Sequence, residues 1–101
     1  MSAANDPIRV MRSMVSSETR AELMMLFHRN PGLMDTVQGI SRRVGNSDSV
    51  VEADLKELVG LGVLKNKKIG KSLVYSLDVT KDREIQGEIT RSIRAMKGAK
   101  P

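Results

Sequence analysis

Residues 35–77 read DTVQGISRRVGNSDSVVEADLKELVGLGVLKNKKIGKSLVYSL and decide the fold of this chain. The first part predicts a short helix. Asp35 is its expected N-cap, Gln38 follows three residues later as in a capping box, and Gly45 ends the helix. Its apolar positions fall on one helical face: Val37, Ile40 and Val44. After the turn Gly45-Asn46-Ser47, residues 48–62 predict a second helix, which Gly60 and Gly62 end. Its buried face is expected to consist of Val51, Leu55, Leu58 and Leu61.

A basic hairpin follows the two helices. The β-favouring runs 63–69 and 72–77 meet at Gly70-Lys71, which predicts a turn between two strands. The first strand and the turn carry Lys65, Lys67, Lys68 and Lys71. Two helices joined by a turn and followed by such a hairpin are the layout of a winged helix-turn-helix, with the hairpin as the wing.

Further helices are expected on both sides of this unit. Ser17 is a plausible N-cap of a helix that ends at Asn30-Pro31-Gly32, with Leu23, Met24 and Phe27 on its apolar face. A shorter helix begins at Pro7, and a long one begins at a Thr80 cap. The predicted fold class is therefore mainly α with a small β-hairpin, an α+β winged helix-turn-helix with additional N- and C-terminal helices. One domain covers residues 1–101, divided into an N-terminal arm or helix (1–15), the core (17–77) and the C-terminal helix (80–97).

The terminal helices carry narrow apolar seams. These seams either pack on each other within the chain or pair with a second copy, and we predict a homodimer because the small core leaves apolar faces at both ends. The residues expected at the dimer interface are Ile8, Met11, Met14, Ile85, Ile89, Ile93 and Met96. The cluster of Met11, Met14, Met24, Met25 and Met34 is expected to be adaptable core or dimer packing, with a ligand cavity as the alternative.

Charge is unevenly distributed along the chain. The net charge is +5, and residues 65–71 hold four lysines and no acid, whereas residues 35–62 hold three basic and five acidic residues. Only Phe27 and Tyr75 are aromatic, which argues against a platform that stacks on single-stranded nucleic acid. Duplex DNA is the favoured polyanionic partner.

Several classes of function find no support in the sequence. There is no cysteine and one histidine, His28, which we expect on the surface of its helix, so neither a metal site nor any other cofactor is expected. No phosphate-binding loop or nucleophile with a base is present, so we do not expect an enzyme. With neither a secretory segment nor a membrane span, the chain is expected to be soluble and cytoplasmic.

Residues 17–77 resemble the ArsR-like winged helix-turn-helix regulators of bacteria and archaea. The likeness rests on Arg20 with Leu23-Met24 and Phe27, Val37 with Ile40, Ser47-x-Ser49-x-Val51, Leu55-Lys56-x-Leu58, Gly62-Val63-Leu64 and, most specifically, Gly70-Lys71-Ser72-Leu73-Val74-Tyr75-Ser76-Leu77. The resemblance implies a dimeric transcription factor that lays the second helix of the motif in a DNA major groove and touches the backbone or minor groove with the wing.

The chain departs from the family in two respects. It lacks the cysteine and histidine clusters of the metal-sensing members, and it has Asp48, Glu52, Ala53 and Asp54 where the helix should face the groove. Carboxylates near phosphates oppose binding, although an acid can accept from cytosine. Alternatively, Ser49 and Glu52 form a capping box with the helix starting near Ser49, and Asp54 and Glu57 pair with Lys56 or with Arg42 and Arg43.

The leading prediction is a sequence-specific regulator that binds double-stranded DNA as a homodimer. We expect bases and backbone to be contacted by Ser47, Ser49, Ala53 and Lys56. Sequence-independent affinity is expected from Arg42, Arg43, Lys65, Lys67, Lys68 and Lys71. Two alternatives remain: lysines on an edge strand also prevent aggregation, and arginines at the end of a helix also complement its dipole. The alternative is a winged-helix module that binds another protein through its acidic helix or apolar seam.

Overall fold

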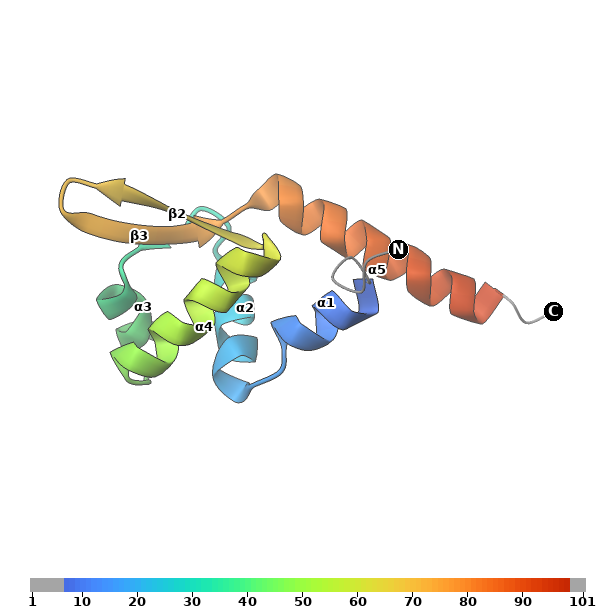
Figure 1. The fold of residues 1–101 in the computed structure, drawn as a ribbon, viewed down its shortest axis with the longest axis horizontal. Coiled ribbons are helices and arrows are strands. Elements are labelled where there is room, and N and C mark those ends of the chain that lie inside the picture. Colours follow the sequence, from blue (N-terminus) through green and yellow to red (C-terminus); the bar gives the residue numbers. More distant parts are fainter. Residues whose placement is uncertain (1–6, 99–101) are drawn as a thin grey trace.

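The structure is a computed structural model that describes residues 7–98, and it contains five helices and a three-stranded sheet (Figure 1). In chain order the elements are α1 (Pro7–Met14), α2 (Glu18–Arg29), β1 (Met34–Asp35), α3 (Val37–Val44), α4 (Asp48–Leu61), β2 (Leu64–Ile69), β3 (Ser72–Leu77) and α5 (Val79–Gly98). This confirms the predicted winged helix-turn-helix with a helix added at each end. Residues 1–6 of the expected N-terminal arm lie outside the described part of the chain.

The sheet has the order β1-β3-β2, and both pairings are antiparallel. The predicted hairpin is confirmed, with Leu64 opposite Leu77 and Ile69 opposite Ser72 around the turn. Strand β1 was not predicted, because two residues are too short to display an alternating pattern. It pairs Met34 with Ser76 and Asp35 with Tyr75, and so attaches the start of α3 to the sheet.

One hydrophobic core joins the helices to the base of the hairpin. Its fully buried side chains come from α2, α3, α4, the segment that follows α4, and the two long strands: Leu23, Phe27, Ile40, Val51, Leu55, Leu58, Val63, Leu64 and Tyr75. The stripe predicted for α4 is confirmed at Val51, Leu55 and Leu58, and Leu61 packs against its edge. The positions of α3 and α4 relative to the wing are therefore set by shared burial.

The helix ends differ from the prediction in detail. Asp35 does not cap α3: it lies in β1 and accepts from the backbone N–H of Thr36 (2.8 Å), whereas the Thr36 hydroxyl accepts from the N–H of Gly39 (3.2 Å). Helix α5 begins at Val79, before the predicted Thr80 cap, and Asp78 Oδ1 accepts from the N–H of Lys81 at 3.0 Å. In each case a polar residue one or two positions from the predicted cap accepts from the first turn of the helix instead, since both side chains are of a type that caps.

Helix α4 begins two residues earlier than a capping box at Ser49 requires. Ser47 is its N-cap, so Asp48 and Ser49 are already helical and the Ser49–Glu52 capping box was wrong. The predicted stop at Gly62 is confirmed by its left-handed backbone (φ 88°), whereas Gly60 lies within the last turn. Gly45 ends α3 in the same way, at φ 68°.

Helix α5 projects from the rest of the molecule (Figure 1), and the principal extents with α5 included are 55 × 25 × 24 Å. Along its seam, exposure rises from 7% at Ile85 to 40% at Ile93 and 69% at Met96. The core and α1 therefore hold the first half of α5, up to about Ile89, whereas its far end is exposed. None of the helices in residues 7–98 combines the length and the apolar character that crossing a membrane requires.

Candidate nucleic-acid interface

The outward face of α4 carries small and basic side chains. Successive residues of an α-helix are about 100° apart, so the face opposite the buried stripe is centred on positions 49, 53 and 56. Ser49, Ala53 and Lys56 are all exposed, one helical turn apart. Three of the four residues predicted to approach the bases thus form a single stripe, and the fourth, Ser47, caps the same helix.

Asp54 does not belong to this outward face. Its Oδ1 lies 3.0 Å from Arg20 Nη2 and 3.1 Å from Arg20 Nε, and the Ser17 hydroxyl donates to its Oδ2 at 3.2 Å. Both charged side chains are only 13% exposed. The expectation that Asp54 faces the groove was therefore wrong, and so was the alternative pairing with Lys56 or the α3 arginines. Arg20 also donates to the Ser13 carbonyl at 2.8 Å, so this group ties the end of α1 to α2 and α4.

Glu52 lies on the flank of α4 that faces the wing. Together with the start of α3 and the wing tip it lines a cleft of about 270 Å³, whose other residues are Thr36, Val37, Gln38, Lys71, Ser72 and Leu73. Burial raises the pKa of Tyr75, and the negative charge of Glu52 raises it further. The carboxylate is thus placed beside the wing tip and its lysine, about 100° around the helix from Ala53.

The wing presents lysines on both of its faces. Side chains of a strand alternate between faces, and Leu64 is buried, so Lys68 lies on the inner side of the hairpin. Lys65 and Lys67 lie on the outer side, and Lys71 lies in the turn. All four are exposed, and β2 is an edge strand.

Both α3 arginines are exposed in the last turn of that helix. Arg43 Nε lies 3.4 Å from Asp35 Oδ2, and its side chain is 51% exposed, so this is a loose surface pair. Arg42 is exposed beside it. The two guanidinium groups are thus held at the end of α3 that leads into the turn and α4.

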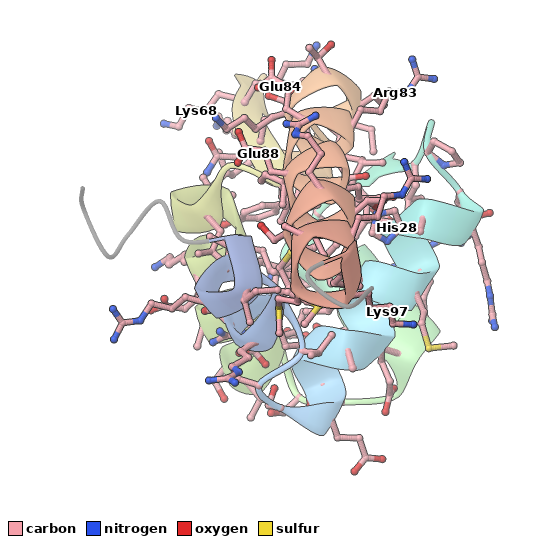
Figure 2. All side chains as sticks on the ribbon, turned by 90° about the vertical axis from the view of Figure 1, so that its right-hand side faces the viewer. His28, Lys68, Arg83, Glu84, Glu88 and Lys97 are labelled. Carbon is pink, nitrogen blue, oxygen red and sulfur yellow. The ribbon has the colours of Figure 1, made fainter. Side chains whose placement is uncertain are left out.

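Sequence reasoning missed a polar cluster at the base of α5. His28 was expected on the surface; its side chain is 34% exposed, but Nε2 lies 3.0 and 2.9 Å from the two carboxylate oxygens of Asp82. Asp82 is 4% exposed and also accepts from Gln86 Nε2 at 2.8 Å. Figure 2 looks along α5 and shows the His28 side chain beside that helix, on α2. No local pattern could have indicated a pair separated by 54 residues.

The predicted dimer residues are distributed between core and surface. Met14 and Ile85 are 7% exposed and lie in the chain's own core, and Ile89 packs against it. Met11 and Ile8 are partly buried on α1, whereas Ile93 and Met96 are exposed. Of the remaining methionines, Met24 is in the core and Met25 and Met34 are half exposed.

Comparison by sequence found no matching family model and no matching curated protein. Solved structures do match. A possible transcriptional regulator from Methanosarcina mazei Go1 superposes with a TM-score of 0.67 at 16% identity, over 91% of this chain and 82% of that one. A protein from the archaeon Sulfolobus tokodaii matches with a TM-score of 0.68 at 17% identity, over 99% and 100%. An ArsR-like transcriptional regulator from Rhodococcus sp. RHA1 gives 0.65 at 18% identity, over 94% and 92%.

These identities are low, and what the superpositions establish is the fold. They extend over α1 and α5 as well as the central unit, since they cover nine tenths or more of the chain. The chain therefore has the winged helix-turn-helix fold of the ArsR-like transcriptional regulators.

Proposed function

We propose that this protein is a homodimeric transcriptional regulator that binds duplex DNA sequence-specifically and acts in the cytoplasm. The observation that carries the proposal is the outward stripe of α4, Ser49, Ala53 and Lys56, from which Asp54 is turned away by its pair with Arg20. The strongest objection to DNA binding was the group of acidic residues at the start of the helix that would enter the major groove. The structure weakens that objection because one acid is sequestered and Glu52 lies beside the wing.

In this function α4 enters the major groove. Ser49 can donate to or accept from a base edge, Ala53 can contact a thymine methyl, and Lys56 can reach a guanine or a phosphate. A small residue at the centre of the stripe lets the helix backbone approach the base pairs closely. Transcriptional regulators among the proteins of the same fold support this assignment.

The wing and α3 would supply the sequence-independent affinity. The four wing lysines are exposed along the hairpin, and Arg42 and Arg43 are exposed at the end of α3. Each phosphate contact made by such a side chain releases condensed counterions, so binding should weaken steeply as salt rises.

A dimer is supported by unpartnered apolar surface at the terminal helices. Ile93 and Met96 project on α5, and a groove of about 470 Å³ lies between α1 and α2, lined by Met11, Met14, Val15, Ala21, Met24, Met25, His28 and Arg29. Because Met14 and Ile85 are already in the core, the interface would use the exposed end of the α5 seam and the outer side of α1. A two-fold axis there would place two α4 helices in successive major grooves, about 34 Å apart.

The alternative function is a winged-helix module that binds another protein. It is favoured by the exposed Val50 and by Asp48 and Glu52, which remain on the surface of α4. A basic partner segment would complement this acidic edge, whereas duplex DNA would avoid it.

Selection of random duplex DNA by the purified protein near physiological salt, followed by sequencing, distinguishes the two functions. The regulator predicts an enriched motif with two-fold symmetry, which Ala53→Glu abolishes. Sequence-blind retention that disappears as salt rises would reject sequence-specific binding and favour a protein partner.

A further inference from the structure

Helix α5 is held by the core at its base and by α1 alongside it. Asp82 and Ile85 are buried, and exposure increases toward the far end of the helix. At the base, the Lys81 side chain lies over Gly62, where a Cβ would be 3.1 Å from Lys81 Cγ. The apolar contact of Ile85 holds the helix against the core but is not directional. Directional contacts at the base can therefore restrict the tilt of α5 further than its apolar packing on the core and on α1 does.

The polar cluster of His28, Asp82 and Gln86 provides such contacts. Its distances are 2.9 and 3.0 Å from His28 Nε2 to the carboxylate, 2.8 Å from Gln86 Nε2 to Asp82 Oδ2, and 3.1 Å between the two Nε2 atoms. Asp82 is almost fully buried, so losing His28 would leave its carboxylate with Gln86 as its remaining side-chain partner in this cluster. A hydrogen bond to a buried charge tolerates little change in angle.

Helix α2 connects this cluster to the reading helix. Near its start, Arg20 holds Asp54 of α4, and in its last turn His28 holds Asp82 of α5. The two ties are eight residues apart, about 12 Å along the helix. The outward face of α4 and the axis of α5 are thus both fixed to one rigid element by directional polar contacts.

Small changes in tilt at the base of α5 are amplified along it. The helix has 20 residues and is about 30 Å long. A tilt of about 10° moves its far end by about 5 Å, more than the rise of about 3.4 Å per base pair. If α5 forms the dimer interface, the angle between α5 and α4 determines the distance between the two reading helices.

We infer that His28, Asp82 and Gln86 are positioning residues that set the spacing between the two DNA half-sites. This inference rests on the proposed function, but its structural part can be tested without DNA. In this role the cluster touches neither the bases nor the phosphates of the DNA. It acts by holding α5 at one angle to α2 and therefore to α4.

The first test measures that angle within one chain. Because the chain has no cysteine, spin labels can be placed at Glu57→Cys on α4 and Arg94→Cys on α5, with labelled chains diluted by unlabelled ones. Electron–electron double resonance should give one narrow distance distribution in the parent. His28→Ala should broaden or shift it, and Glu84→Gln, an exposed α5 control, should leave it unchanged. An unchanged distribution in His28→Ala would overturn the inference.

The second test measures spacing. Duplexes carrying two selected half-sites separated by spacers of graded length are offered to the parent, to Asp82→Asn, and to the charge-matched Glu84→Gln. We expect the preference of the parent for its own spacing over one base pair more or less to fall about tenfold in Asp82→Asn. Affinity for a single half-site should stay within about twofold, because the reading face is untouched.

The outcomes separate the inference from the function on which it rests. If Asp82→Asn binds DNA specifically with an unchanged spacing preference, even at a lower melting temperature, the cluster has only a structural role. That result would overturn this inference and leave the proposed function standing. If the parent binds no specific duplex, the proposed function fails and the half-site inference fails with it, whereas the label distances still report whether the cluster positions α5.

Discussion

Arg20 Nη2 lies 3.0 Å from Oδ1 of Asp54, and this pair removes an acid from the face of α4 that would meet DNA. Arg20 belongs to α2 and Asp54 to α4, and the two residues are 34 positions apart in the sequence. The pair therefore has two roles: it joins α2 to α4, and it leaves Ser49, Ala53 and Lys56 as the outward stripe.

Breaking this pair should destabilise the fold. Arg20→Ala leaves the Asp54 carboxylate 13% exposed and without its main partner, so we expect the free energy of unfolding to fall by about 2–4 kcal/mol. Urea denaturation followed by circular dichroism measures it. Glu84→Ala, which breaks the exposed pair with Lys81, is the control and should cost less than about 1 kcal/mol. Equal effects in both variants would mean that the Arg20 pair is no stronger than a surface pair.

The outward stripe of α4 can be tested with a charge at its centre. Ala53→Glu places a carboxylate between Ser49 and Lys56, and we expect affinity for the selected duplex to fall about a hundredfold or more. The melting temperature should hardly change, since the position is exposed. Fluorescence anisotropy measures the affinity, and Thr80→Glu on α5 is the control. Undiminished affinity in Ala53→Glu would remove α4 from the interface.

Sequence and structure agree where a short-range pattern carries the information. The helical period of Val51, Leu55 and Leu58 predicted the buried face of α4 and hence the outward one, and Gly70-Lys71 predicted the wing turn. Position along the chain could not reveal that His28 meets Asp82, because such a pair exists only after the helices pack. The caps were misplaced for the opposite reason: several polar residues within two positions of each helix start were equally able to cap.

The wing should contribute through charge alone. Lys67→Glu together with Lys68→Glu should weaken binding to all duplexes and lower the slope of log affinity against log salt by about one to two units. Filter binding between low and moderate salt gives the slope. The variant Arg83→Glu with Arg91→Glu, on exposed positions of α5, makes the same change in net charge and should leave the slope nearly unchanged. An unaltered slope in the wing variant would place the wing outside the interface.

Two glycines in helices should respond oppositely to alanine. A Cβ on Gly39 would overlap the Asp35 carboxylate, which accepts from the Thr36 N–H, so Gly39→Ala should destabilise the protein by about 1–3 kcal/mol. Gly60 is exposed in α4 with open space around it, so Gly60→Ala should stabilise it by about 0.5–1 kcal/mol. Urea midpoints compare the two variants. A stabilised Gly39→Ala would show that Asp35 moves away without cost.

The exposed end of α5 should control association. Ile93→Asp together with Met96→Asp places two charges on the apolar seam, at positions 40% and 69% exposed, and should convert the dimer to a monomer without unfolding it. Sedimentation equilibrium measures the mass. Val79→Asp, at the other end of α5 and 39% exposed, should remain a dimer. A parent protein that is already monomeric at micromolar concentration would contradict the proposed interface.

The central claim is that α4 reads a DNA sequence, and the ratio of two affinities tests it most directly. The purified protein is titrated at physiological salt into the selected duplex and into a shuffled duplex of the same length and composition. Specific readout predicts a preference of about a thousandfold or more for the selected site, which collapses in Ala53→Glu. Equal affinities that fall together as salt rises would contradict the claim and leave only electrostatic attraction to the lysines and arginines.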